Sequence, residues 1–122
     1  MKPRHSPLQR IWKACLYSRD GLIAAIRGEA AFRQELALFS VALLVIFVIP
    51  LALEAKLLLL MANSIILIIE ILNSAIEAVV DLAKPEYSAL AKKAKDMGSA
   101  AVFLSFLLAI SIWGALLGAE FL

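Results

Sequence analysis

The sequence predicts an all-α membrane protein, with an N-terminal amphipathic surface helix followed by three transmembrane helices in one domain over residues 1–122. The first observation behind this prediction is composition. Apolar residues make up 63% of the 122 residues, a share that is unusual for a soluble fold. The second is that three apolar runs, at 36–53, 57–80 and 97–119, each reach about the 18 residues that indicate a membrane-spanning helix.

The N-terminal segment is amphipathic rather than uniformly apolar. From Leu8 to Leu16 apolar residues recur at helical spacing, with a tryptophan among them, and basic residues lie on the other side. This pattern is typical of a helix on the membrane surface, and its plainest interpretation is an interface anchor. We expect this helix over about 8–26, after a frayed stretch at 1–7, with a bend where residues 18–21 interrupt the pattern.

The first span is expected over about 30–53. Glu29 and Arg33 stand four residues apart, a spacing that can support a helical ion pair of about 0.2 to 0.5 kcal/mol. Pro50 should end or kink the helix near its outer end. The second span, over about 57–80, follows after a short link, so the two spans should form a tight helical hairpin.

The segment between the second and third spans contains Pro85. Residues 84–87 predict a turn, because the residue before a proline avoids the α region. Residues 88–95 predict a short polar helix that leads to the third span, over about 97–119. Gly114 and Gly118 form a GxxxG motif near the outer end of that span, and the sequence leaves open whether it makes a helix contact.

The basic residues predict the orientation in the membrane. Seven of the 12 Lys and Arg residues precede residue 36, and four lie between residues 81 and 96. The positive-inside rule therefore places the N-terminus and the 81–96 segment in the cytoplasm, and the C-terminus on the outer side. The net charge of +2 is too small, and too closely tied to topology, to indicate a nucleic-acid partner.

Several kinds of chemistry are excluded by what the chain lacks. Cys15 and His5 are the single cysteine and histidine, so an intrachain disulfide, a thiolate metal cluster and a Ser-His triad are all excluded. The sequence also lacks the GxxxxGK[ST] phosphate loop, the GxGxxG motif and the protein-kinase motifs.

The second span carries polar groups that a simple anchor does not need. Glu70, Asn73 and Glu77 share one helical face, with the two carboxylates about 10 Å apart along the axis. An ionisable group at the centre of a span costs about 2.5 to 3.5 kcal/mol on insertion scales, and such groups are functional by default. Glu70 is therefore a candidate proton acceptor that Asn73 could orient. Ser64 and Ser74 are more simply explained as interhelical hydrogen-bonding groups.

Further charged groups gather where the spans meet the cytoplasm. Carboxylates from separate helices, with a lysine nearby, suit Mg²⁺ that also binds phosphate oxygens. This arrangement indicates a phosphate donor entering from water and an acceptor arriving within the membrane. The residues concerned are Glu29, Glu35, Glu77, Asp81, Lys95 and Asp96.

Three runs closely resemble prokaryotic diacylglycerol kinase: EAAFRQE at 29–35, EILNSAIEAVVD at 70–81, and AKDMGSAAV at 94–102. The resemblance extends over 10–113, and the second run is the most specific. It implies a homotrimer in a bacterial inner membrane, with the N-terminus in the cytoplasm and the C-terminus in the periplasm. Active sites would lie between subunits and would transfer the γ-phosphate of MgATP to diacylglycerol, giving phosphatidic acid.

The resemblance also implies roles for individual residues. Glu70 is the expected catalytic base, assisted by Asn73, and Glu29 and Glu77 are the expected ligands of Mg²⁺ and the nucleotide. The surface helix then becomes part of the site. The other expected nucleotide contacts are Arg10, Tyr17, Glu86, Lys95 and Asp96. The expected lipid-substrate positions are Arg10, Ala14, Ser18, Ala31, Phe32, Arg33, Gln34, Glu35, Glu70, Ser99 and Trp113.

Three positions depart from the enterobacterial pattern of this family, where Asp20, Ile23 and Gly28 replace a lysine, an arginine and an asparagine. These departures bear on acceptor preference and nucleotide affinity. Similar proteins of Gram-positive bacteria phosphorylate undecaprenol, although the run at 97–99 is closer to the diacylglycerol branch. An undecaprenol kinase is therefore the first alternative. A small proton-coupled transporter with Glu70 as carrier, and a structural subunit, are the others.

Overall fold

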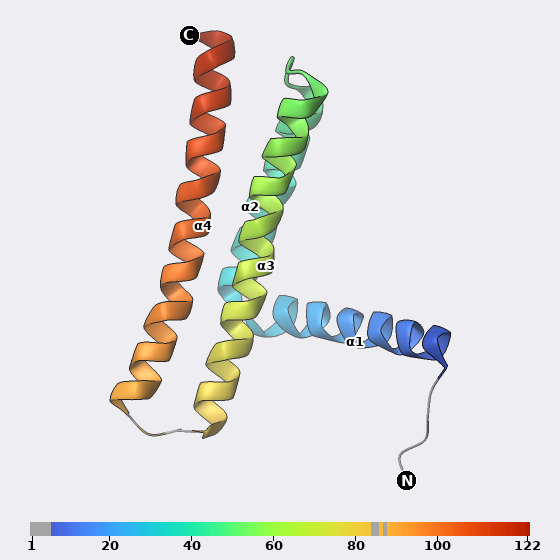
Figure 1. Ribbon diagram of the computed structural model, residues 1–122, viewed down its shortest axis with the longest axis vertical. Coiled ribbons are helices and arrows are strands. Elements are labelled where there is room, and N and C mark those ends of the chain that lie inside the picture. Colours follow the sequence, from blue (N-terminus) through green and yellow to red (C-terminus); the bar gives the residue numbers. More distant parts are fainter. Residues whose placement is uncertain (1–5, 84–85, 87) are drawn as a thin grey trace.

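The computed structural model describes residues 6–83, 86 and 88–122, and these residues form four helices (Figure 1). The helices are α1 (Pro7–Gly28), α2 (Ala30–Val48), α3 (Leu53–Ala83) and α4 (Ala89–Phe121). Helices α2, α3 and α4 run side by side, whereas α1 extends away from them, starting beside the lower end of α2 (Figure 1). No strand occurs among the described residues, so the predicted fold class is confirmed. Most of the turn predicted at 84–87, and most of the stretch predicted to fray at 1–7, lies outside the described residues. Ser6 and Pro7 are described, and they start α1 rather than fray.

Helix α1 is continuous, so the bend predicted at residues 18–21 is wrong. The helix starts with a capping box, in which Ser6 accepts from the Gln9 backbone and the Gln9 side chain accepts from Ser6, with Pro7 at the first helical position. Gly21 lies inside a helix at a cost of only about 1 kcal/mol relative to alanine, which the remaining turns tolerate. Ser18 is accommodated because its hydroxyl donates to the Ala14 carbonyl at 2.8 Å.

The chain instead turns at Glu29, which is both the C-cap of α1 and the N-cap of α2. Its backbone is extended, with φ −120° and ψ 106°, so the helices on either side point in different directions. Arg33 stabilises this elbow because its Nη1 donates to the carbonyls of Ile26 at 2.8 Å and Arg27 at 3.1 Å. These carbonyls belong to the last turn of α1, which has no helical donors left for them. Among the described residues Arg33 forms no ion pair with Glu29, and its guanidinium instead caps the end of α1.

Replacing Arg33 with alanine is expected to loosen the elbow. Two hydrogen bonds from a charged donor would be lost at an exposed site, at a cost of about 1 kcal/mol. Hydrogen exchange of the backbone amides at residues 22–29 should then become faster in Arg33→Ala. Arg27→Ala is the matched control, because Arg27 contributes its backbone carbonyl here, which that substitution keeps. Equal exchange in the two variants would show that Arg33 does not stabilise the end of α1.

The hairpin between the first two spans forms as predicted, but α2 is shorter than the expected 30–53. It ends at Val48, with Ile49 as its C-cap, two residues before Pro50. Lys56 at the start of α3 closes the connection, since its Nζ donates to the Phe47 carbonyl at 3.2 Å.

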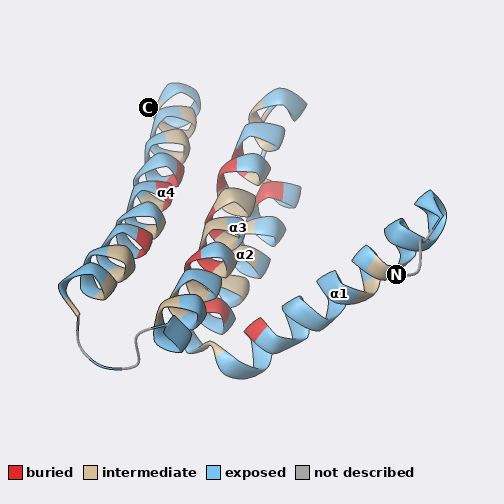
Figure 2. Cartoon of the chain, turned by 60° about the horizontal axis from the view of Figure 1, so that its bottom comes forward, coloured by how far each residue is buried: buried red, intermediate tan, exposed pale blue. Residues whose placement is uncertain are grey.

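Helices α3 and α4 pack antiparallel through one face of each (Figure 2). The buried residues recur every three or four positions along α3, which is the spacing of one helical face. The buried positions of α4 are small, so the two helices approach closely. Those of α3 are Leu59, Ala62, Ile66, Glu70 and Asn73, and those of α4 are Gly98, Ser105 and Ala109.

Helix α4 combines two elements that the sequence pattern predicts as separate. The expected polar helix at 88–95 and the third span form one helix of 33 residues, capped by the Ser88 hydroxyl, which accepts from the Ala91 amide. Helix α3 has 31 residues. Both exceed the roughly 20 residues that a span needs, so both can carry their charged ends beyond the apolar layer. By length and composition α2, α3 and α4 can each cross a membrane.

Candidate functional site

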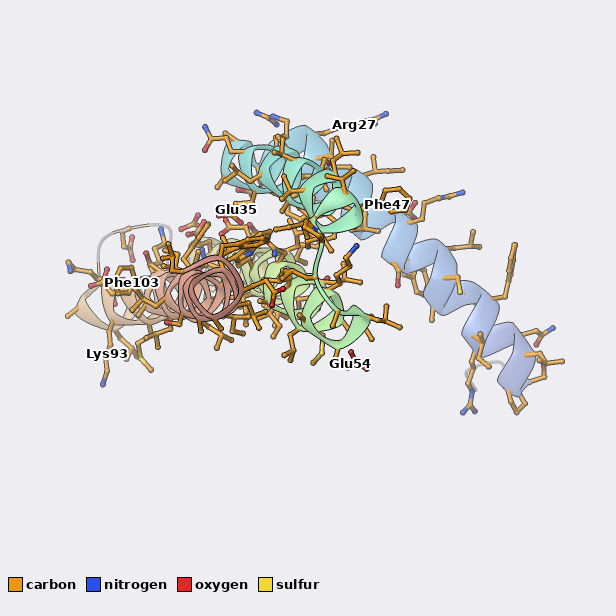
Figure 3. The ribbon with its side chains drawn as sticks, turned by 90° about the horizontal axis from the view of Figure 1, so that it is seen from above. Arg27, Glu35, Phe47, Glu54, Lys93 and Phe103 are labelled. Carbon is orange, nitrogen blue, oxygen red and sulfur yellow. The ribbon has the colours of Figure 1, made fainter. Side chains whose placement is uncertain are left out.

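The centre of the site is a pair of carboxyl groups between α2 and α3. Glu70 is 5% exposed, so its side chain is turned toward protein. Glu35 of α2 lies opposite, close enough for the two side chains to share a hydrogen bond. Viewed along α2, α3 and α4, Glu35 lies on the side of α2 that faces α3 and α4 (Figure 3). The two carboxyl groups thus come from different helices, with Glu70 buried and Glu35 half-buried.

One turn from Glu70 toward the charged end of α3, Asn73 forms a hydrogen bond with a third acid. The Asn73 Nδ2 donates to the Glu77 Oε1 at 3.3 Å. Asn73 is buried and Glu77 is half-buried. The shared face predicted for Glu70, Asn73 and Glu77 is therefore present. It forms a polar strip that leads from the buried carboxyl pair toward the end of the helix.

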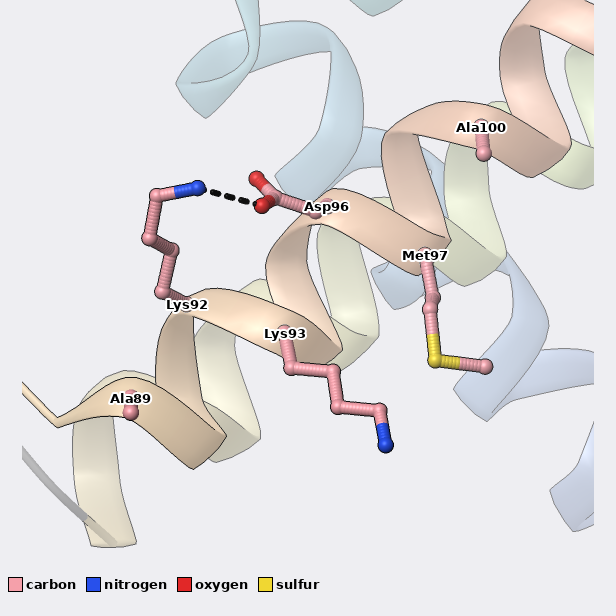
Figure 4. A pocket seen from close by; sticks show the side chains of 6 residues that line it. All are labelled: Ala89, Lys92, Lys93, Asp96, Met97 and Ala100. Atoms are coloured by element: carbon pink, nitrogen blue, oxygen red, sulfur yellow. Dashed lines mark hydrogen bonds and ion pairs between the residues drawn. The ribbon is translucent and has the colours of Figure 1, made fainter.

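Lys95 of α4 stands beside the end of this strip. Its Nζ forms an ion pair with the Asp81 Oδ1 at 2.6 Å, with the two side chains 43% and 61% exposed. Asp96 points elsewhere, since its Oδ2 pairs with the Lys92 Nζ at 2.6 Å (Figure 4). Within one chain the side chains of the neighbouring residues Lys95 and Asp96 therefore lie on different faces of α4. The Asp96 face borders a shallow pocket of about 410 Å³.

The acids near Glu70 offer oxygen ligands but not a complete metal site. Glu29 and Glu77 both lie near enough to act electrostatically on Glu70. Within residues 6–83, 86 and 88–122, no three His, Cys, Asp or Glu side chains come together as metal ligands. The oxygen donors of Glu29 and Glu77 are of the kind that Mg²⁺ prefers, and Mg²⁺ commonly takes only one or two carboxylates alongside phosphate oxygens.

Several expected site residues lie away from this centre. Those of α1 are exposed, and α1 contacts the other described helices mainly through α2, so they do not reach Glu70 in the single chain. The set comprises Arg10, Ala14, Tyr17 and Ser18. Among the other expected residues, Ala31, Gln34, Glu86 and Ser99 are exposed, Phe32 is buried, and Trp113 packs against the cluster of Ala62, Ile66 and Ala109.

Two further polar residues lie along this face of α3: Asp81 at its charged end, whose partner the sequence does not identify, and Asn63, which the sequence does not identify as a site residue. Asp81 was expected near the end of the second span, but its pairing with Lys95 depends on how α3 and α4 align. Asn63 lies seven residues before Glu70, on the same face of α3. It borders a cavity of about 20 Å³ with Glu35 and Phe106, and its Nδ2 donates to the Leu59 carbonyl at 2.7 Å. The seven-residue spacing from Glu70 was the signal for Asn63.

Comparison with known proteins identifies relatives along nearly the whole chain. The family model described as prokaryotic diacylglycerol kinase matches residues 16–117. A diacylglycerol kinase of Escherichia coli (strain K12) is 47% identical over 116 residues, covering 92% of each chain. One from Pseudomonas aeruginosa is 44% identical over 110 residues, covering 90% of this chain and 89% of the relative. One from Helicobacter pylori (strain 26695) is 39% identical over 127 residues, covering 98% and 94%.

Proposed function

The chain belongs to the prokaryotic diacylglycerol kinase family, and from this membership we propose that it transfers the γ-phosphate of ATP to the hydroxyl group of diacylglycerol. The product would be phosphatidic acid. The structural observation that carries the proposal is the polar strip on α3, which runs from the buried Glu70 through Asn73 and Glu77 toward the Lys95–Asp81 ion pair at the charged helix ends. A lipid hydroxyl would arrive at the buried end and the nucleotide at the charged end.

The proposed reaction is a direct in-line displacement. The acceptor hydroxyl oxygen forms a bond to the γ-phosphorus while the bond to the β–γ bridging oxygen breaks, and ADP leaves. Glu70 accepts the hydroxyl proton, and the Glu35 carboxyl group that lies opposite is close enough to position it. Lys95 offsets the charge on the transferring phosphoryl group. Glu29 and Glu77 would hold Mg²⁺, which would neutralise phosphate charge.

A homotrimer with sites between subunits is part of the same proposal. In one chain, Arg10 and Tyr17 are exposed on α1 and distant in the fold from the strip on α3. The outer faces of the spans carry many exposed large apolar side chains, which can contact both lipid and helices of other subunits. A second copy whose α1 lies beside the strip would bring the missing nucleotide and lipid residues to it.

The proposed location is the inner membrane of a bacterium. The three apolar helices and the family place the chain in a bacterial membrane. The distribution of Lys and Arg supports a cytoplasmic N-terminus and a periplasmic C-terminus. In that orientation the Lys95 end of the strip faces the cytoplasm, where ATP is found.

Phosphate transfer from labelled MgATP in mixed micelles tests the proposal, with diacylglycerol and undecaprenol compared side by side. We expect the diacylglycerol product to form at least about tenfold faster, a difference of about 1.4 kcal/mol in the transition state. Faster transfer to undecaprenol would keep the mechanism and change the acceptor. Transfer to neither would refute the proposed function, and proton-driven uptake by vesicles without ATP would then support a transporter.

A further inference from the structure

We propose that Gly98 of α4 is a positioning residue for the reaction, because its lack of a side chain seats the Asn73 carbonyl and turns the Asn73 amide toward Glu77. The contact itself is a property of the fold. Its consequence for phosphate transfer rests on the proposed function.

The first observation is steric and is specific to this glycine. Gly98 is buried where α4 meets α3. A β-carbon at this position would collide with the Asn73 Oδ1 and would lie 3.4 Å from the Asn73 Cγ. By contrast, a β-carbon built on Gly21, Gly28, Gly114 or Gly118 would meet nothing within 4 Å. Asn73 thus occupies the volume that any larger residue at position 98 would require.

The second observation concerns the hydrogen bonding of Asn73. Its Oδ1 is buried, and no conventional donor reaches it from the part of the chain that the structure describes. The Cα–H of Gly98 points at this oxygen from the direction a β-carbon would take, which is the arrangement of a weak Cα–H···O contact. The other end of the amide, Nδ2, donates to the Glu77 Oε1 at 3.3 Å.

Together these contacts select one orientation of the amide. Rotating it by 180° would place the Asn73 oxygen against the Glu77 carboxylate, where two acceptors would repel, and would place the NH₂ group against the Gly98 Cα–H. The space that Gly98 leaves for the Asn73 oxygen, called the seat here, therefore keeps the Asn73 Nδ2 hydrogen-bonded to Glu77. A residue with a β-carbon would displace Asn73 and release the Glu77 carboxylate, which the proposed mechanism uses on the nucleotide side.

The kinetic test compares Gly98→Ala with Gly114→Ala, a substitution in the same helix with nothing within 4 Å. Displacing a catalytic group by about 1 Å can cost about 100-fold, so we expect Gly98→Ala to lower kcat/KM by about 10- to 100-fold. The KM for MgATP should rise more than the KM for the lipid, because Glu77 lies at the nucleotide end. Gly114→Ala should retain wild-type kinetics. Equal kinetics of Gly98→Ala and Gly114→Ala would overturn the proposal.

A second test uses Asn73→Ala, which removes the group that collides. In that background Gly98→Ala should cost less than about twofold, because residues that act as a unit are not additive. A further loss as large as in the wild type would assign Gly98 to general helix packing and overturn the proposal. If Gly98→Ala alone does not fold, folding of the double variant would support the steric seat, and failure of the double variant would refute it.

A spectroscopic test separates this inference from the proposed function. The chain has two asparagines, Asn63 and Asn73, so selective ¹⁵N-asparagine labelling gives two side-chain NH₂ signals. Gly98→Ala should shift the Asn73 signal and leave that of Asn63 in place. Unchanged Asn73 signals would refute the seat even in an active enzyme. If the wild-type protein transfers no phosphate, a shift of the Asn73 signal in Gly98→Ala would still support the seat, and only the proposed function would be refuted.

Discussion

Glu70→Gln is expected to lower phosphate transfer by about 100- to 10,000-fold, the usual contribution of a general base. The amide keeps the shape of the buried side chain and can still bond to Glu35, so the fold should remain. It has no carboxylate oxygen to accept the hydroxyl proton. The rate is measured with labelled MgATP and diacylglycerol in mixed micelles. Size-exclusion chromatography in detergent shows whether the oligomer is intact.

The matched control for this prediction is Glu54→Gln, at an exposed position in the first turn of the same helix (Figure 3). This substitution makes the same chemical change far from the proposed site and should leave turnover within about twofold of wild type, as surface changes usually do. Turnover of Glu70→Gln within the same range would remove Glu70 from the mechanism. The neighbouring Glu35 would then be the next carboxyl group to test as the proton acceptor.

The helical architecture could be predicted because apolar run length is a strong local signal. The ends of the helices were harder to place, since they depend on capping contacts. Arg33 ends α1 by reaching carbonyls six and seven residues back in the chain, so the break falls at Glu29. Ser18 and Gly21 look like breakers in sequence, yet a continuous amphipathic helix absorbs them. A local cost of about 1 kcal/mol is too small to interrupt its remaining turns.

The candidate site was predictable along one helix and not between helices. Helical spacing alone places Glu70, Asn73 and Glu77 on one face, and they do share it. The pairing of Lys95 with Asp81, and of Asp96 with Lys92, depends on the relative rotation of α3 and α4. The close approach of Gly98 to Asn73 likewise arises from packing of residues 25 positions apart. Spacing along the sequence does not predict such contacts between helices.

Lys95→Gln is expected to lower phosphate transfer by about 100- to 1,000-fold, as when a donor to a developing anion is removed. A loss of this size in Lys95→Gln would not be due to unfolding. Lys95 and Asp81 are 43% and 61% exposed, and an exposed ion pair contributes only about 0 to 1 kcal/mol. Lys92→Gln is the matched control. It also removes one lysine charge from α4, but this lysine pairs with Asp96 on a different face of the helix. Thermal unfolding in micelles should be similar for both variants.

Asp81→Asn tests whether Asp81 only holds Lys95 in place or is itself required for phosphate transfer. If Asp81 merely holds Lys95 until a phosphate displaces it, the weak exposed pair should change the KM for MgATP by less than about fivefold, corresponding to 1 kcal/mol. Lys95 would then lose one partner and still bind the phosphoryl group, leaving kcat near wild type. A loss in Asp81→Asn as large as in Lys95→Gln would mean that the carboxylate itself is required during transfer. Wild-type rates in both variants would remove this end of the strip from the mechanism, and phosphate binding would have to be sought at Lys92, Lys93 and the pocket beside Asp96.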